Sequence, residues 1–181
     1  MSEIGNMFET TNVPVFTWEG WLFDDMELTA SSANGETSAN ASQVVIQSPS
    51  HDIAAGHTGT VTVSGGASKF SYGQVLASGD NIATVAGNSG QSAVFAYDTN
   101  DTLDGGLSAP ARRVAMFPSY STPTEITADG WDIFEAGVDW AANAAPPPPG
   151  AGNQVSFHLT PMVQDWLTGD LANNGVEIAP T

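Results

Sequence analysis

The sequence contains no cysteine and only three basic side chains, and each shortage excludes a class of structure or partner. Without cysteine the chain has no disulfides, thiolate metal sites or cysteine nucleophiles, so packing alone must hold the fold. Twenty acidic residues stand against Lys69, Arg112 and Arg113, which gives a formal charge of -17 at pH 7. Because such a surface repels phosphate backbones and anionic lipids, we expect no nucleic-acid partner, whereas cations, neutral sugars and basic proteins remain compatible.

Long apolar runs are also missing. No stretch of about 18 apolar residues occurs, so we expect no membrane insertion. The first residues, MSEIGNMFETTN, have no basic region followed by an apolar one, so we expect no export signal in them. The 181 residues are nonetheless 41% hydrophobic and include five tryptophans, which is enough for the core of one domain, or of one domain and a fragment.

Short runs of β-branched and apolar residues between Gly, Ser and Asn predict a set of strands. The expected strands cover residues 13–18, 43–47, 59–64 and 112–117, with a hairpin formed by 81–86 and 92–97 around GNSGQ. A short helix or helical turn is expected directly after the first strand, in EGWLFDDMEL.

The clearest helix follows Thr127, which can cap its N-terminus. Trp131, Phe134 and Val138 recur at helical spacing on one face, which favours core packing for the tryptophan. Asp129 and Asp132 suit the positive end of the helix dipole. The helix should end near Asn143, because four prolines follow shortly and proline cannot continue a helix.

The ordered blocks VPVFTWEGWLFDDMELT, SPSHDIAAGHTGTVTV, QSAVFAYDTNDTLDGGLSAPARRVAMF and ITADGWDIFEAGVDWA resemble a flavodoxin-like α/β domain of large secreted bacterial proteins, loosely akin to ThuA-like domains. The match spans residues 1–144. It implies a three-layer α/β fold with added antiparallel strands. In that family further strands precede the VPV strand, so the resemblance also implies a domain that is incomplete at its N-terminus.

The segment after the prolines resembles a different module. VSFHLTPMVQDWLTGDLANNGVEI is similar to the signature of DNRLRE-type β-sandwich modules, which accompany secreted carbohydrate-active proteins. We therefore expect a proline-rich linker at 145–153 and a module fragment at 154–181, folded as a short strand and helix appendage. One strand and a two-turn helix cannot bury enough surface to stand alone, so this piece either docks on the preceding domain or has lost its own.

Three carboxylates near the end of the first strand form a candidate ligand site. In an open α/β sheet, Glu19, Asp24 and Asp25 would lie where ligands bind, and could hold a cation or act as general acid and base. They could equally cap or solvate a short helix. His51 is a further candidate for ligand binding, because Ser48, Ser50 and Asp52 lie beside it in the sequence and superficially offer Ser, His and Asp together. The sequence has no G-x-S-x-G nucleophile turn, so a structural role in a turn is the simpler interpretation.

The loop DTNDTLDGG gathers hard oxygen donors. Asp98, Asn100, Asp101 and Asp104 suggest a calcium site, although the spacing is not that of an EF-hand and a plain acidic loop is the alternative. We expect any metal response to be weak and calcium-like. Arg112 and Arg113 either anchor an anion or pair with nearby carboxylates.

These observations favour a non-catalytic accessory or binding module. The resemblance places it in a secreted or cell-surface bacterial protein associated with carbohydrate, with other domains of that protein and polysaccharide as partners. The alternatives are a ThuA-like hydrolase or amidotransferase-related domain that has lost its standard nucleophile, and a structural spacer. The absence of cysteine and of a G-x-S-x-G nucleophile turn favours the binding module over the enzyme.

Overall fold

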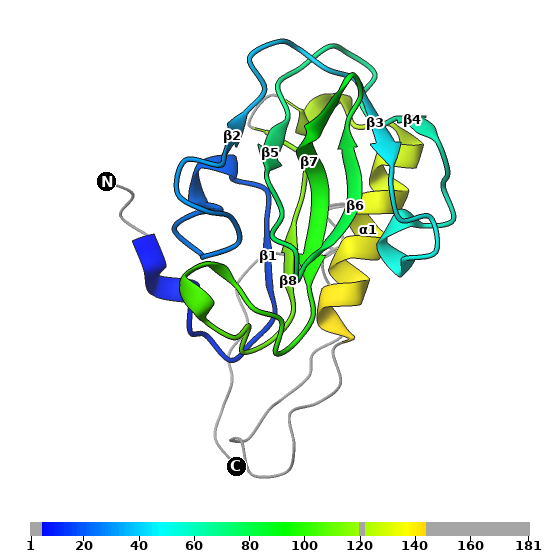
Figure 1. Ribbon diagram of the computed structural model, residues 1–181. Helices are drawn as coiled ribbons and strands as arrows, with labels where there is room; N and C mark the ends of the chain where they lie inside the picture. Colours follow the sequence, from blue (N-terminus) through cyan, green and yellow to red (C-terminus); the bar gives the residue numbers. More distant parts are fainter. Residues whose placement is uncertain (1–4, 120–121, 144–181) are drawn as a thin grey trace, which may run out of the picture. The chain divides into compact units, whose positions relative to one another are not determined.

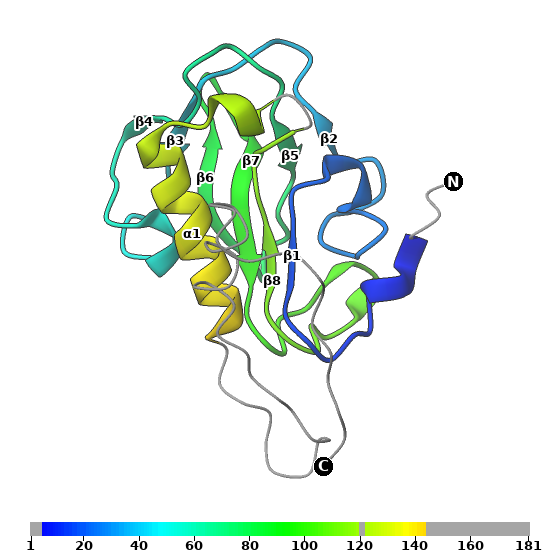
Figure 2. The ribbon, with the colours of Figure 1, turned by 180° about the vertical axis from the view of Figure 1, so that it is seen from behind.

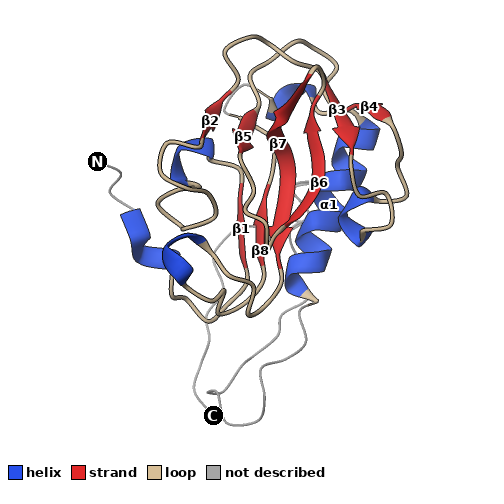
Figure 3. Cartoon of the chain, in the orientation of Figure 1, coloured by secondary structure: helices blue, strands red, loops and turns tan. Residues whose placement is uncertain are grey.

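A mixed eight-stranded sheet forms the centre of the domain in a computed structural model of the chain, which describes residues 5–119 and 122–143 (Figures 1 and 3). The chain divides into two units, Met1–Ala145 and Pro146–Thr181, and the described residues all belong to the first. The strands are β1 (Val15–Thr17), β2 (Asn34–Glu36), β3 (Gln43–Ile46), β4 (Thr60–Thr62), β5 (Ser71–Gly73), β6 (Asp80–Val85), β7 (Asn88–Tyr97) and β8 (Arg113–Ala115). The helical elements are α1 (Ala128–Ala142) and the short 3₁₀ turns η1 (Gly5–Phe8), η2 (Gly20–Leu22), η3 (Asp52–Ala54), η4 (Asp104–Gly106) and η5 (Pro123–Glu125).

The strands run in the order β1-β8-β7-β6-β3-β4, and β5 joins β2 to the side of β7. Among the strands that the structure describes, only β1 and β8 pair in parallel, with Val15 opposite Arg113. Every other pairing among the described strands is antiparallel. The sheet is therefore built mainly from neighbours that double back on one another, not from parallel crossovers.

Most of the expected elements are confirmed. Strands lie within or across all the ranges expected from the apolar runs, and β6 and β7 form the hairpin around Gly87, whose φ of +82° suits glycine. The two short strands β2 and β5 were not expected. Their sequences, NGE and SYG, have no alternation of apolar and polar residues, so nothing local indicates that they pair.

Helix α1 covers one face of the sheet and packs against β1, β4 and β8 (Figure 2). The Thr127 side chain caps it, accepting a 3.0 Å hydrogen bond from the Gly130 amide. Two glycines allow α1 to lie close to the residues beneath it. A Cβ at Gly130 would lie 2.4 Å from the Val63 carbonyl oxygen, and a Cβ at Gly137 would lie 2.2 Å from the terminal methyl group of Met116. Beneath the helix, Ile133 is fully buried.

Loop residues, not a second layer of helices, cover the opposite face. Phe23 and Leu28 from the segment after η2, with Leu103 from the loop after β7, pack on Phe95 and Tyr97 of β7. The Tyr97 hydroxyl donates a 2.7 Å hydrogen bond to the Leu28 carbonyl, and burial raises the pKa of Tyr97 to about 12. Alternate residues of β7 thus serve two separate cores, since Val94 and Ala96 belong to the cluster under α1.

The expected flavodoxin-like three-layer α/β fold is wrong. That fold needs parallel strands joined by helices that cover both faces, whereas the described residues contain one α-helix, on one face of a largely antiparallel sheet. The connection between β7 and β8, for example, is a loop with only the turn η4. The expected linker at 145–153 and appendage at 154–181 lie outside the described residues. None of the helices described is long and apolar enough to cross a bilayer.

Candidate functional site

Four aromatic rings from β1 and α1 meet at the surface, and we call them the aromatic cluster: Phe16, Trp18, Trp131 and Phe134. Phe134 is its centre, with ring centroids 4.9 Å from Phe16, 5.8 Å from Trp18 and 5.4 Å from Trp131. The Phe16 and Trp131 rings meet Phe134 edge-on, the favoured geometry for aromatic pairs. A short strand and the first turns of a helix therefore hold one continuous aromatic surface.

The two tryptophans of this cluster remain open to solvent. Trp18 is 45% exposed and Trp131 is 41% exposed, and Val138, on the same side of α1, is 42% exposed. The expectation that helical spacing would bury Trp131 in the core is wrong, because the helix buries the neighbouring face that carries Ile133. Large exposed apolar surfaces of this kind mark binding sites more often than isolated exposed residues do.

Two of the three carboxylates of the candidate ligand site accept hydrogen bonds from nearby groups. Glu19 caps η2, its Oε1 accepting a 3.3 Å hydrogen bond from the Trp21 amide. Asp24 accepts from Asn34 Nδ2 at 2.8 Å. Asp25 is half-buried in the turn that follows. Two of the three thus stabilise the segment between β1 and β2, and their role in binding a ligand stays a prediction.

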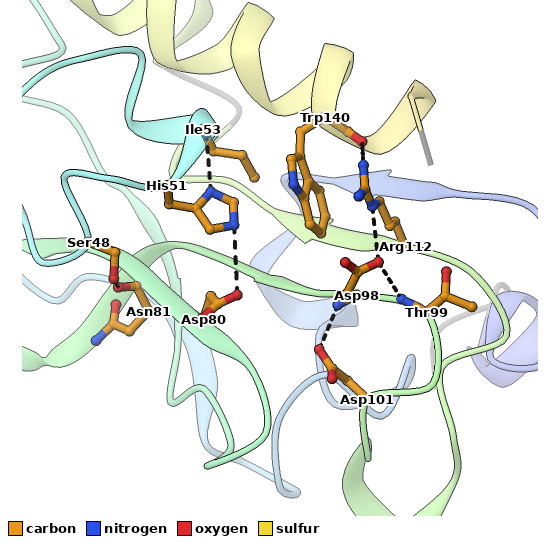
Figure 4. Close-up of polar contacts among 10 residues, drawn as sticks. All are labelled: Ser48, His51, Ile53, Asp80, Asn81, Asp98, Thr99, Asp101, Arg112 and Trp140. Atoms are coloured by element: carbon orange, nitrogen blue, oxygen red, sulfur yellow. Dashed lines mark hydrogen bonds and ion pairs between the residues drawn. The ribbon is translucent and has the colours of Figure 1, made fainter. Parts of the chain in front are cut away.

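His51 lies in a polar network with Asp80, Trp140 and Arg112 (Figure 4). Its Nδ1 accepts a 3.1 Å hydrogen bond from the Ile53 amide, which caps η3, and its Nε2 lies 3.7 Å from Asp80 Oδ2. Its ring also packs beside Trp140, with centroids 5.3 Å apart.

The hydrogen bond that Nδ1 of His51 accepts fixes the tautomer of the neutral ring. Since Nδ1 accepts, the neutral ring carries its proton on Nε2, which faces a carboxylate. Nδ1, the nitrogen that would have to take a proton from a nucleophile in this tautomer, is occupied by the Ile53 amide. The hydroxyl of Ser48 donates instead to the Asn81 carbonyl at 2.9 Å, so the Ser, His and Asp residues seen together in the sequence do not form a triad.

The acidic loop after β7 is tied to the same network (Figure 4). Partial burial would raise the pKa of Asp98, but the 3.1 Å hydrogen bond from Arg112 and the Thr99 amide together hold that pKa below its usual value. Asp101 Oδ2 accepts a 2.6 Å bond from the Asp98 amide. Asn100 has a positive φ of 75° and Asp104 begins η4. The calcium site at these four residues stays a prediction.

The two arginines behave differently. Arg112 pairs with Asp98 and its guanidinium lies 4.2 Å from the centroid of the Trp140 ring, as the carboxylate-pairing alternative expected. Arg113 is only 1% exposed, and its partners are main-chain carbonyls, including Thr11 at 2.7 Å and Val13 at 2.9 Å. Burial lowers the pKa of Arg113 to about 10, so it remains charged at neutral pH.

A shallow hollow of about 360 Å³ lies at the other end of the sheet, beside β3 and the β6–β7 turn. Its lining is uncharged and contains no aromatic ring: Thr37, Ser38, Ala39, Asn40, Ala41, Ser42, Gln43, Val85, Ala86, Gly87, Asn88 and Gln91. Amide and hydroxyl groups without a titratable partner can bind but offer no acid, base or nucleophile poised for catalysis.

Comparison with protein-family models, curated protein sequences and solved structures gives no match for this chain. Its function must therefore be argued from the residues and their geometry.

Proposed function

We propose that the domain is a non-catalytic binding module that recognises a neutral polysaccharide through the aromatic cluster. The observation that carries this proposal is the partial exposure of Trp18 and Trp131 on either side of Phe134. Rings held at a surface by other rings lose little conformational entropy when they bind. Each can stack on the apolar face of a sugar ring without needing a charged partner.

The charge of the chain supports a neutral ligand over a charged one. A formal charge of -17 repels polyanions, and neither Arg112 nor Arg113 belongs to the aromatic cluster. Polyhydroxylated chains have no charge to be repelled and present alternating apolar and polar faces. The proposal includes a role at the cell surface, beside other domains that act on or hold polysaccharide, as the sequence resemblance implies.

The hydrogen bonding of the catalytic candidates supports binding over catalysis. His51 has both ring nitrogens facing structural partners, and the Ser48 hydroxyl donates to a main-chain carbonyl. Glu19 and Asp24 accept local hydrogen bonds. The hydrolase alternative would need at least one of these groups to be released for proton transfer.

Affinity electrophoresis tests the proposal directly. The full chain is run through gels containing hydroxyethylcellulose, xylan or laminarin, with alginate as an acidic comparison. We expect retardation by at least one neutral polymer and none by alginate. Trp18→Ala and Trp131→Ala should each abolish most of the retardation while leaving the circular dichroism spectrum unchanged.

Trp21→Ala is the matched control, because Trp21 is 63% exposed but makes none of the ring contacts of the cluster. Equal loss of retardation in this control would show that any exposed tryptophan suffices and would remove the assignment to the cluster. Migration unaffected by every neutral polymer, with quenching of tryptophan fluorescence also absent, would overturn the proposal.

A further inference from the structure

Three metal-ligating side chains converge beside the first turns of α1. His57 comes from the loop after η3, and Asp129 and Asp132 from the helix. One ligand atom from each lies within 4.8 Å of the others, and this is the one such group found among the residues that the structure describes. His57 lies more than 70 positions before Asp129 and Asp132 along the chain, so only the fold brings it to the two aspartates.

The Nε2 atom of His57 is the unusual member of this group. It is buried, and it has no hydrogen-bond partner within the described domain. It lies 3.7 Å from Asp132 Oδ2, which is too long for a hydrogen bond. Two ligands of one tetrahedral zinc ion, each about 2.1 Å from the metal, lie about 3.4 Å apart. The observed spacing is thus close to that of two atoms sharing an ion.

The surrounding backbone fixes this arrangement. Ala55 and Gly56 both have positive φ, 51° and 76°, and turn the chain so that the His57 amide donates to the Ala54 carbonyl at 2.8 Å. Asp129 and Asp132 are three residues apart, so their carboxylates lie on one face of α1. The close approach of Gly130 to the Val63 carbonyl holds that end of the helix against the sheet.

We propose that His57, Asp129 and Asp132 bind one divalent first-row transition metal ion, with zinc as the reference. One imidazole and two carboxylates form a donor set that zinc, cobalt and nickel accept, whereas calcium prefers oxygen donors alone. The Asp132 side chain is 61% exposed, which leaves room for water in the remaining coordination positions. This site is separate from the acidic loop of Asp98, for which the sequence suggests calcium with a plain acidic loop as the alternative, and it departs from the sequence-based expectation of a weak, calcium-like metal response.

The site is also independent of the proposed polysaccharide surface. At 100° per residue, Asp129 and Asp132 lie on the side of α1 roughly opposite to Trp131 and Phe134. Loss of metal binding and loss of polysaccharide binding can therefore be measured separately, and either proposal can fail alone.

The test is calorimetric titration of the full chain, stripped of metal with a chelator, with ZnCl₂ and then with CoCl₂. We expect one ion per chain, and a visible cobalt absorption band typical of a four- or five-coordinate site. His57→Gln and Asp132→Asn should each weaken zinc binding by at least about tenfold, because each removes one of three protein ligands.

Asp139→Asn and His51→Gln serve as matched controls. Asp139 is an exposed aspartate of the same helix, and His51 is the histidine at the other end of η3. Both variants should bind zinc as the parent chain does. Circular dichroism and the melting temperature without metal establish that each variant is folded.

Three results would overturn the proposal. Absence of zinc and cobalt binding would show that the three side chains do not hold a metal ion. If Asp139→Asn weakens zinc binding as much as Asp132→Asn does, the effect comes from the general negative charge of the helix and not from a specific ligand. Binding that survives His57→Gln but is lost in Asp101→Asn would place the ion in the loop after β7.

Discussion

The Nη2 atom of Arg113 donates a 2.7 Å hydrogen bond to the main-chain carbonyl of Thr11, which lies 102 residues earlier in the chain. Nη1 of the same side chain reaches the carbonyls of Val13 and Ala111. No carboxylate pairs with this guanidinium in the part of the chain that the structure describes. The buried Arg113 side chain therefore links the N-terminal segment to β8 through several hydrogen bonds to main-chain carbonyls.

Arg113→Met should destabilise the domain by about 2–4 kcal/mol. Each buried carbonyl left without a donor costs about 1–3 kcal/mol, and the loss is partly offset because a charge is no longer buried. Urea denaturation measures the change. Arg113→Lys should lose less stability than Arg113→Met, because the ammonium group keeps the charge and can still donate to some of the carbonyls. It should lose some stability, because an ammonium cannot span all of them. A change in the free energy of unfolding below about 0.5 kcal/mol in Arg113→Met would contradict this linking role of Arg113.

Gly130→Ala should cost more stability than Gly137→Ala, although both lie in α1 and alanine is the better helix former. At Gly130 the new Cβ meets the rigid carbonyl of Val63, whereas at Gly137 it meets the flexible end of Met116. We expect a loss of about 2–3 kcal/mol at the first site and about 1 kcal/mol at the second. Thermal unfolding of the two variants side by side gives the ranking, and the reverse order would be inconsistent with these contacts.

Glu27→Gln should stabilise the domain at neutral pH. Burial, with the charges of Glu9, Asp104 and Asp24, raises the pKa of Glu27 above 4.5. A carboxyl that holds its proton more tightly when folded favours the folded state at low pH, and this contribution is lost as pH rises through the raised pKa. The gain should be on the order of 1–2 °C in Tm at pH 7, limited by solvent screening, and should vanish below pH 4.5.

Asp25→Asn controls for the general effect of removing one negative charge from the same segment. Asp25 is not among the charges that raise the pKa of Glu27. A similar rise in Tm for both variants, or a gain for Glu27→Gln that persists in acid, would argue against the local repulsion.

Asp98→Asn should have the opposite pH dependence. The pKa of Asp98 is held below 3.8, so its ionised form stabilises the folded state above that pH, and the contribution is lost as pH falls through the lowered pKa. The variant should lose roughly 0.5–1 kcal/mol at pH 7, the range for a partly exposed ion pair. A double-mutant cycle with Arg112→Met measures the coupling between the two side chains. Zero coupling would mean that the 3.1 Å contact adds no stability.

Elements with local signals were predictable from the sequence, and pairings between distant segments were not. The cap at Thr127 and the apolar spacing after it predict α1 correctly, because both are local features. The strands under α1 were recognised by their β-branched runs. Their direction relative to one another depends on long-range pairing, which the sequence blocks do not encode, and the resemblance of those blocks to an α/β domain implied the wrong fold class.

The candidate sites show the same division. The expected roles of His51 rested on its neighbours in the sequence, yet its partner in the structure is Asp80. Asp132 has a sufficient local explanation as a partner of the helix dipole, and His57 lies more than 70 positions away, so nothing in the sequence indicates that they meet. Exposure of Trp131 was missed because helical spacing identifies an apolar face without showing how much of it the sheet covers.

The single parallel pairing also has a kinetic consequence. Val15 pairs with Arg113, 113 − 15 = 98 positions away, so this contact raises the contact order of the domain and closes a loop that costs about 4 kcal/mol in chain entropy. During synthesis at roughly 5–20 residues per second, β1 leaves the ribosome several seconds before β8, its partner among the described strands, has been made. Phe16 and Trp18 remain without their aromatic partner Phe134 for longer still, until α1 has been synthesised. The rate of translation between residues 18 and 134 therefore sets how long these two aromatic side chains are open to chaperones or to aggregation.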